Sequence, residues 1–258
     1  MIPTPSLPAR PSSPTQRPPY RQRKLGGILA AFAIALCTPA LAHASYAERE
    51  DARAFAAEIA SRHAVDAGEI ERALAGARHD PEVIRLITPP SRKGVRSWRS
   101  YRARFLDRTR IDGGMRFWHE HADTLERAER ETGVPAEVIV AIIGVETIYG
   151  RNTGNFETLS TLATLAFDYP PRAELFRREL EALFLLAREQ GRDPASYYGS
   201  FAGALGYPQF LPSSMRAYAL DFDGNGSIAF DSDPLDAIGS VANYLRVHGW
   251  QLGAPVAD

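Results

Sequence analysis

Residues 134–150 constrain the fold more than any other segment, because they are apolar on nearly every side. The segment reads VPAEVIVAIIGVETIYG, and its charged residues are Glu137 in the first turn and Glu146 near the end. Pro135 at the start and Gly150 at the end are typical of helix boundaries. Since a helix that is hydrophobic all round is normally buried, we predict a buried helix here.

Glu146 is the unusual residue of this predicted helix, because a buried and unpaired charge is expensive. No Lys or Arg lies three or four residues away on the same face, where the sequence has Ile142, Ile143, Tyr149 and Gly150. A desolvated carboxyl without a cationic partner should have a raised pKa. Such a pKa suits a general acid that works near neutral pH.

The first 44 residues do not resemble a folded domain. Residues 1–20 are rich in Pro and Ser and are predicted to be a disordered extension. A basic stretch, an apolar run over 25–36 and small residues over 40–44 then follow, the order found in a secretory signal peptide. We expect export to the periplasm with cleavage after Ala42 or Ala44; the alternative is an uncleaved membrane anchor.

Cys37 is the single cysteine of the chain and lies inside this signal. Lipidation at Cys37 is an alternative route to the membrane, although Ile34-Ala35-Leu36 places a bulky residue where a small one is usual. Cleavage after residue 42 removes five basic residues and no acidic one, which leaves 25 basic against 31 acidic residues and a net charge of −6. An acidic exported protein is a poor candidate for binding nucleic acid.

The rest of the chain, residues 45–258, predicts a mainly α fold. Helical spacing of apolar residues occurs over 46–62, 67–77, 96–107, 114–132, 172–190 and 233–248. A single short segment, 227–230, looks like a strand. Residues 197–212 are dense in Gly, Pro and aromatics, which fits either a shallow groove for sugar rings or a loop packed on the core.

An acidic loop matches the front half of an EF-hand. Asp221, Asp223 and Asn225 occupy positions 1, 3 and 5, Gly226 occupies position 6, and Ser227 would supply a backbone carbonyl at position 7. Position 12 is Ser232 rather than Glu, so the closing carboxylate must come from elsewhere, and Asp236 is the best placed. The alternative is that these residues form turns and cap the last helix. We favour a structural Ca²⁺ site.

These motifs together resemble the lytic murein transglycosylase B family. The resemblance extends from Trp98 to Trp250 in the order and spacing of the family. Besides the acidic loop, it is carried by residues 144–150, 163–170, 199–204, 209–214 and 236–244.

The resemblance implies a lysozyme-like α fold with a calcium loop and an enzyme that acts on the glycan strands of peptidoglycan. It implies cleavage of the β-1,4 bond between N-acetylmuramic acid and N-acetylglucosamine, with formation of a 1,6-anhydro ring. Glu146 matches the family's catalytic acid, which would then act as the base; hydrolytic glycosidases use a carboxylate pair instead. A hydrolytic muramidase, a non-catalytic peptidoglycan-binding module and a stand-alone calcium-binding protein remain alternatives. Other cell-wall enzymes are candidate partners.

Other positions are carried over from the family individually. Ser200 and Tyr244 match residues near the catalytic carboxyl, and the remaining matches to substrate-contacting positions are Gln209, Tyr101, Arg172 and Phe201. Each also has an ordinary alternative, such as a turn for Ser200, helix packing for Tyr244 and a surface charge for Arg172.

The family usually continues well beyond residues 248–250, with a segment that returns to the active site. We therefore expect residues 45–258 to form the catalytic domain without that segment.

Overall fold

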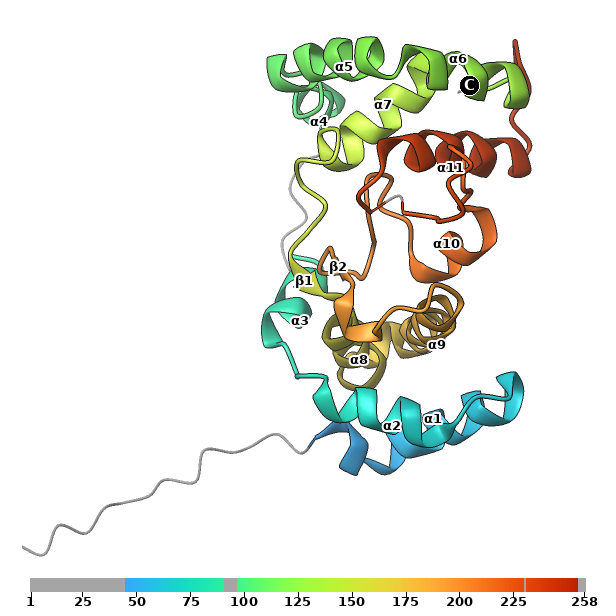
Figure 1. The fold of residues 1–258 in the computed structure, drawn as a ribbon. Helices are drawn as coiled ribbons and strands as arrows, with labels where there is room; N and C mark the ends of the chain where they lie inside the picture. The colour runs from blue at the N-terminus through green and yellow to red at the C-terminus, as the bar shows by residue number, and fades with distance from the viewer. Residues whose placement is uncertain (1–44, 91–96, 230, 255–258) are drawn as a thin grey trace, which may run out of the picture. The chain divides into compact units, whose positions relative to one another are not determined.

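The computed structural model describes residues 45–90, 97–229 and 231–254, and the predicted extension, signal peptide and Cys37 lie outside these residues. The prediction of a mainly α fold is confirmed (Figure 1). The α-helices are α1 (Glu50–His63), α2 (Ala67–Gly76), α3 (Pro81–Ile87), α4 (Trp98–Arg102), α5 (Arg108–Glu120), α6 (Ala122–Thr132), α7 (Ala136–Thr147), α8 (Thr158–Asp168), α9 (Ala173–Glu189), α10 (Pro212–Tyr218) and α11 (Pro234–Val247). The 3-10 helices are η1 (Tyr46–Glu48), η2 (Pro170–Arg172) and η3 (Pro194–Ser196), and the strands are β1 (Phe156–Glu157) and β2 (Tyr198–Gly199).

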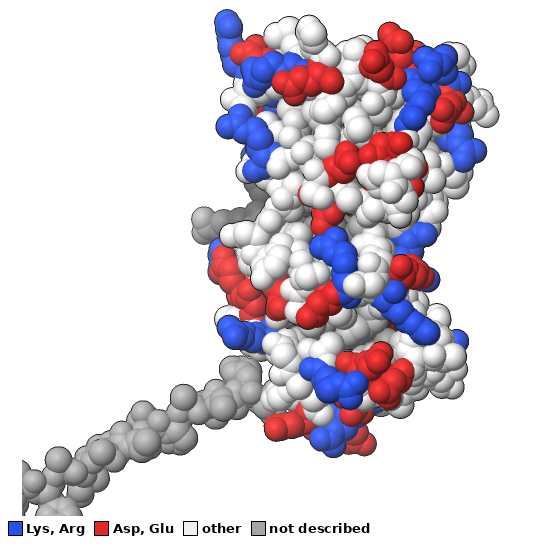
Figure 2. Space-filling model, viewed as in Figure 1, with Lys and Arg blue, Asp and Glu red and all other residues white. Residues whose placement is uncertain are grey.

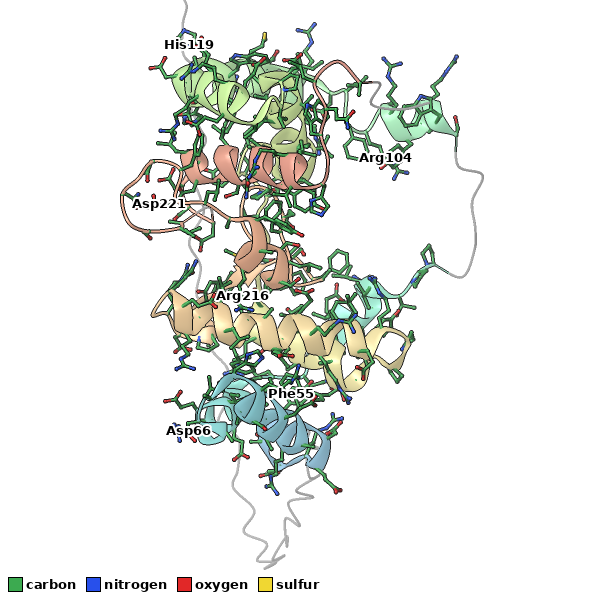
Figure 3. The ribbon with its side chains drawn as sticks, turned by 90° about the vertical axis from the view of Figure 1, so that its right-hand side faces the viewer. Phe55, Asp66, Arg104, His119, Arg216 and Asp221 are labelled. Carbon is green, nitrogen blue, oxygen red and sulfur yellow. The ribbon has the colours of Figure 1, made fainter. Side chains whose placement is uncertain are left out.

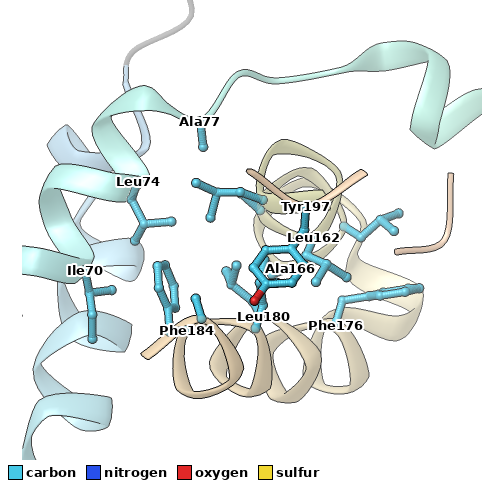
Figure 4. Packing of buried hydrophobic residues seen from close by; sticks show 14 of the residues in the cluster. Ile70, Leu74, Ala77, Leu162, Ala166, Phe176, Leu180, Phe184 and Tyr197 are labelled. Atoms are coloured by element: carbon cyan, nitrogen blue, oxygen red, sulfur yellow. The ribbon is translucent and has the colours of Figure 1, made fainter. Parts of the chain in front are cut away.

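One hydrophobic core is built around α8 and α9. Residues 158–167 of α8 are all buried, so this helix has no solvent-facing side. Leu162 and Ala166 of α8 pack with Leu180 of α9, and α2 covers the cluster through Leu74 (Figure 4). Because α8 is buried all round, it lacks the amphipathic period by which a helix is recognised in a sequence.

A second core lies among α5, α6, α7 and α11. Ile139 and Ile143 of α7 are fully buried in one cluster with Leu125 of α6 and Ile238 of α11. Tyr207 packs against both this cluster and the first one. The helix that carries Glu146 is therefore held from several sides.

Three predicted elements differ from the observed ones. The helix expected over 114–132 is broken at His121 into α5 and α6, which allows both pieces to pack on α7. The helix expected over 96–107 is limited to α4, which ends at Arg102. The prediction of a strand over 227–230 is wrong for residues 227–229, the part of this range that the structure describes, because they form no strand.

The backbone of residues 227–229 is paired with side chains instead of with another strand. The carbonyl of Ile228 accepts a hydrogen bond from Gln190 Nε2 (3.2 Å), and the amide of Ala229 donates to Asp236 Oδ2 (2.9 Å). The observed strands, β1 and β2, pair antiparallel with Phe156 opposite Gly199. Among the residues that the structure describes, no helix is both long and apolar enough to cross a membrane.

Asp168, the last residue of α8, joins the N-terminal helices to the first core. Its carboxylate accepts hydrogen bonds from Tyr46 Oη (2.6 Å) and Arg49 Nη1 (2.5 Å), and it lies 2.9 Å from His79 Nδ1. Burial alone would raise the pKa of Asp168, but its partners Tyr46, Arg49 and His79 outweigh burial and lower that pKa.

Replacing Asp168 by Asn should lower the free energy of unfolding by about 1.5–3 kcal/mol, the usual contribution of hydrogen bonds to a charged group. The folded-state pKa of Asp168 is lowered below the ordinary value of an aspartate. Its stabilisation is therefore present above the unfolded pKa and is lost as pH falls through the folded pKa. Urea unfolding at neutral and acidic pH measures both effects. Asp66→Asn, an exposed helix cap, is the control and should change stability by less than about 0.5 kcal/mol; equal losses in both variants would contradict the prediction.

Candidate active site and calcium loop

Glu146 lies in the last turn of α7, on the side of the helix that faces solvent. Glu137, Ala141, Val145 and Glu146 are exposed, whereas the opposite side of α7 is buried. The prediction that Glu146 is buried is therefore wrong. The apolar residues Ala141 and Val145, the latter at 42% exposure, are likewise exposed instead of lying in a core.

The carboxyl of Glu146 is nevertheless partly desolvated, and this burial raises its pKa. Among the described residues Glu146 makes no hydrogen bond or ion pair, and desolvation is the only cause of the pKa shift. A second carboxylate nearby would add a charge-repulsion contribution. The geometry is thus that of one carboxyl without a charged neighbour, whose raised pKa favours the protonated form that a general acid needs.

The turn after Glu146 has an uncommon backbone. Ile148, Tyr149 and Gly150 have positive φ angles of 54°, 59° and 81° in succession. A positive φ is costly for a β-branched residue such as Ile. Strain of this kind persists only where surrounding contacts over-determine the conformation.

Tyr149 supplies those contacts, because its ring lies in a slot made by three glycines. A Cβ atom added at Gly113, Gly114 or Gly144 would overlap the Tyr149 ring or hydroxyl. The hydroxyl also donates a hydrogen bond to the carbonyl of Arg110 (3.0 Å). The ring therefore locks α5 to the end of α7.

Thr147 joins the same turn to the loop that contains Tyr207. Thr147 is fully buried, and its Oγ1 donates to the carbonyl of Tyr207 (2.9 Å) and accepts from the amide of Gly150 (3.0 Å). Gly150 packs directly on the Tyr207 ring, where no side chain would fit. The Gly- and aromatic-rich segment is thus fixed to the residues next to Glu146.

Ser200 and Gln209 have most of their polar atoms occupied by this packed loop. Ser200 Oγ accepts from the amides of Ala202 (3.3 Å) and Ala204 (3.1 Å), and Gln209 Nε2 donates to the carbonyls of Thr153 and Gly206 (both 3.0 Å). These bonds leave the Ser200 hydroxyl hydrogen and Gln209 Oε1 for other partners. Both side chains are therefore positioned in advance by the backbone.

Tyr244 of α11 belongs to an aromatic cluster. Its ring lies 5.3 Å from that of Phe210, 5.1 Å from that of Tyr218 and 4.1 Å from that of His248. The structure describes no hydrogen bond from the Tyr244 hydroxyl. The ring thus packs in the way the ordinary alternative predicted, and the hydroxyl remains available to a ligand.

Tyr101 is connected to the end of α7 by a series of contacts. Its ring is 54% exposed and lies between those of Trp98 (5.9 Å) and Phe105 (5.1 Å). The guanidinium of Arg110 lies over Phe105 (5.6 Å), and its Nε donates to the carbonyl of Gly144 (3.2 Å).

Phe201 and Arg172 complete the predicted contacts. Phe201 is partly exposed in the turn after β2. Arg172 is exposed at the end of η2, with its guanidinium 5.4 Å from the centre of the Phe176 ring in α9. This contact places Arg172 against the first core, and the structure describes no contact between it and the turn after Glu146.

The acidic loop brings three predicted metal ligands together. One carboxylate oxygen from each of Asp221, Asp223 and Asp236 lies within 4.8 Å of the others. Asp236 is fully buried, and its oxygens accept from the amides of Phe222 (2.7 Å) and Ala229 (2.9 Å). Three hard oxygen donors at this spacing fit a Ca²⁺ ion.

Asn225 and Ser227 lie in the same exposed loop, which projects beside α11 at Asp221 (Figure 3). Asn225 Oδ1 accepts from the amide of Ser227 (2.8 Å). The loop is anchored by Phe222, whose ring packs on Gly239 and lies 3.8 Å from the guanidinium of Arg127, which also donates to the Phe222 carbonyl.

Sequence reasoning missed the residues that support Glu146, namely Thr147, Tyr149 and the three glycines around the tyrosine ring. A signal was present, because Gly113 and Gly114 stand side by side where the expected helix over 114–132 begins, and inside a helix each glycine is costly unless something packs closely against it. The sequence gives no indication of which ring that is.

Comparison with known proteins identifies the family of the chain. A family profile described as the transglycosylase SLT domain matches residues 47–258, and the chain belongs to this family. The membrane-bound lytic murein transglycosylase B of Escherichia coli K12 is 43% identical over 221 residues, which cover 82% of this chain and 61% of the relative. The chain thus spans less than two thirds of that relative's length.

Solved structures show the same fold. The catenated lytic transglycosylase SltB1 of Pseudomonas aeruginosa is 48% identical with a TM-score of 0.79, covering 82% of this chain and 69% of that one. Slt35 of E. coli, solved in complex with calcium, is 44% identical with a TM-score of 0.73 and covers 82% and 65%. SltB3 of P. aeruginosa, solved with NAG-anhNAM-pentapeptide, is 32% identical with a TM-score of 0.70 and covers 82% and 55%. The predicted family and its lysozyme-like helical fold are confirmed.

Replacing Gly144 by Ala should displace the Tyr149 ring and lower the free energy of unfolding by about 1–3 kcal/mol, the usual cost of overpacking. The gain in helix propensity, up to about 1 kcal/mol, offsets part of this loss. Gly76→Ala at the end of α2 is the matched control, because nothing lies within 4 Å of the added carbon. Thermal unfolding compares the two; a Gly144→Ala variant as stable as Gly76→Ala would exclude a tight slot.

Proposed function

We propose that the protein is a peptidoglycan lytic transglycosylase that cleaves the β-1,4 bond after N-acetylmuramic acid and leaves a 1,6-anhydro end. The observation that carries the proposal is Glu146: a single carboxyl with a raised pKa and without a described partner, held at the end of a fixed helix. Membership of the transglycosylase SLT domain family supports the same reaction class.

One carboxyl is sufficient for this reaction. Protonated Glu146 donates its proton to the glycosidic oxygen as the bond to C1 breaks. The resulting carboxylate then accepts the proton of the C6 hydroxyl as O6 bonds to C1, so proton and charge balance without water. Most hydrolases use a second carboxylate, either to activate water or as the nucleophile, and among the described residues burial is the only cause of the raised pKa of Glu146.

The surrounding residues have complementary roles in this proposal. The hydroxyl hydrogen of Ser200, Oε1 of Gln209 and the hydroxyl of Tyr244 would bind the N-acetyl and hydroxyl groups of the sugars. The exposed rings of Tyr101 and Phe201 offer apolar faces to sugar rings. Arg172, at a distance from the turn, would contact a peptide or a more remote sugar.

The acidic loop would bind a structural Ca²⁺ ion. Asp221, Asp223, Asn225 and Asp236 would supply side-chain oxygens, and Ser227 its carbonyl. The calcium complex of the Slt35 relative supports this assignment. A bound ion would neutralise the buried Asp236 and thereby fix α11, which carries Tyr244.

The substrate would be met outside the cytoplasm. The signal-like residues 1–44 would direct the chain to the periplasm, with attachment to the membrane through an uncleaved signal or lipidation at Cys37 as alternatives. The NAG-anhNAM-pentapeptide bound by the SltB3 relative supports glycan strands with peptide stems as the partner. Binding to other cell-wall enzymes is a further proposal.

Glu146→Gln should reduce release of anhydro-muropeptides from sacculi by about a thousandfold or more, since general acid–base catalysis contributes about 10²–10⁴-fold at each use. Its melting temperature should stay close to that of wild type, because the carboxyl is exposed and has no described partner. Mass spectrometry of the digest identifies the chemistry. Glu137→Gln, exposed on the same helix, is the control and should remain active. Reducing ends in place of anhydro ends would assign hydrolysis, and binding to sacculi without any release would assign a non-catalytic module.

The pH profile tests the same group. Since Glu146 must be protonated in the first step, kcat/KM should fall as pH rises through its pKa, which burial places above the ordinary carboxyl value. If kcat/KM instead fell at the ordinary carboxyl pKa of about 4.3, the role of desolvation would be contradicted.

Calcium should stabilise the folded state by mass action, by about 2.7 kcal/mol when its concentration is a hundred times Kd. Melting curves with calcium and with a chelator measure the increment. Asp236→Asn should lose most of the calcium-dependent increment, whereas Asp233→Asn should keep it, because Asp233 caps α11 outside the carboxylate cluster. Identical melts with calcium and chelator would remove the metal assignment.

A further inference from the structure

A pocket of about 210 Å³ lies between α5 and the turn that follows Glu146. Ile148, Tyr149 and Arg151 line it from the turn, and Arg116 and Glu120 line it from α5. Pockets for drug-sized ligands usually measure about 300–1,000 Å³, so this one suits a single chemical group better than a saccharide.

Two cations define its chemistry. Arg116 and Arg151 are both exposed, and neither guanidinium has a hydrogen bond, ion pair or ring contact among the described residues. Arg110, Arg127 and Arg192 are by contrast all engaged with carboxylates, carbonyls or rings. Although acidic and basic side chains are interspersed on the face shown in Figure 2, these two guanidiniums have no described counterion.

The other polar groups leave an excess of positive charge. Glu120 is the acidic residue that lines the pocket, and it forms no described ion pair with either arginine. His121 also lines the pocket and packs edge-on against Phe117, with 4.6 Å between ring centres. A ligand that carries carboxylates, with or without one ammonium group, matches this arrangement.

Arg151 is held in place by the backbone. Its amide donates to the carbonyl of Ile148 (3.4 Å), and the amide of Asn152 donates to the carbonyl of Thr147 (2.9 Å). The strained left-handed turn therefore places Arg151 in a defined position relative to Glu146. Strain of this kind is concentrated at functional sites.

The pocket shares residues with the turn and the loop that support the candidate acid. Tyr207 lines it, and the carbonyl of Tyr207 accepts from Thr147, the residue next to Glu146. Thr153, two residues after Arg151, accepts from Gln209 (3.0 Å). A ligand in the pocket therefore contacts the same turn that positions the candidate acid.

We propose that this pocket binds a free carboxylate of the peptide stem carried by the substrate, through Arg116 and Arg151. The assignment rests on the proposed function, which supplies a glycan strand bearing acidic peptides. Three observations support the assignment: the size of the pocket, its two guanidiniums without counterions, and its lining by the turn after Glu146. The pocket makes the protein selective for peptide-bearing strands.

The first test compares two soluble substrates, glycan strands with stems and the same strands stripped by an amidase. For the double variant Arg116→Ala, Arg151→Ala, the KM for strands with stems should rise about tenfold, which corresponds to about 1.4 kcal/mol. The kcat and the kinetics on stripped strands should not change. Arg178→Ala on α9, an exposed arginine also without a described partner, is the control and should behave as wild type. Equal effects on both substrates, or none, would overturn the proposal.

The second test needs no turnover. Calorimetry or NMR titration with a synthetic stem peptide should show that the peptide binds to the wild type. The double variant should bind the peptide about tenfold more weakly, and amidation of the peptide carboxylates should abolish binding. If the protein binds the peptide in this way but has no lytic activity, the peptide-binding role of the pocket is supported and the proposed reaction is refuted. Lytic activity without arginine-dependent peptide binding would refute the pocket alone. Displacement of the peptide by equimolar inorganic phosphate would assign a general anion site instead.

Discussion

The packing of one aromatic ring among glycines determines where the candidate acid lies. Tyr149 occupies the space that side chains at Gly113, Gly114 and Gly144 would need, and its hydroxyl is bonded to the backbone of α5. Because interiors are close-packed, a ring in such a slot allows little movement of either helix. The end of α7, and with it Glu146, is therefore positioned by α5 and does not depend on contacts of the carboxyl itself.

The same principle applies around the turn. Thr147 and Gly150 connect it to Tyr207, and Gln209 connects it to the loop that holds Ser200. Each of these contacts ends on a backbone carbonyl or a glycine, so the candidate site is supported mainly by main-chain geometry. The candidate site residues Ser200 and Gln209 can then keep free atoms, because their remaining atoms are already used for positioning.

The sequence predicts much of this, and where it fails the reasons are physical. Helices with one apolar face, such as α9 and α11, are predictable because periodicity records which side is buried. The helix α8 has no such side and was not predicted, and His121 breaks a helix that the apolar pattern continues through. The sequence singles out Glu146 because no cationic partner lies near it. The sequence does not predict that Glu146 is exposed, since an apolar helix can border a ligand groove as well as a core. The slot for Tyr149 is formed by residues from two helices and a turn. These residues are in contact only in the folded chain, so local sequence patterns do not predict the slot.

The position of Glu146 in the last turn of α7 has an electrostatic consequence. The carbonyls of Ile143, Gly144 and Thr147 at this helix end accept hydrogen bonds from the following turn or from Arg110, so the partial negative charge of a helix C-terminus is reduced there. The raised pKa of Glu146 is therefore due to burial, and it depends on the residues that shield the carboxyl from water. In the proposed reaction, a substitution among the residues that border Glu146 would therefore change the strength of the proton donor together with the strands that are bound.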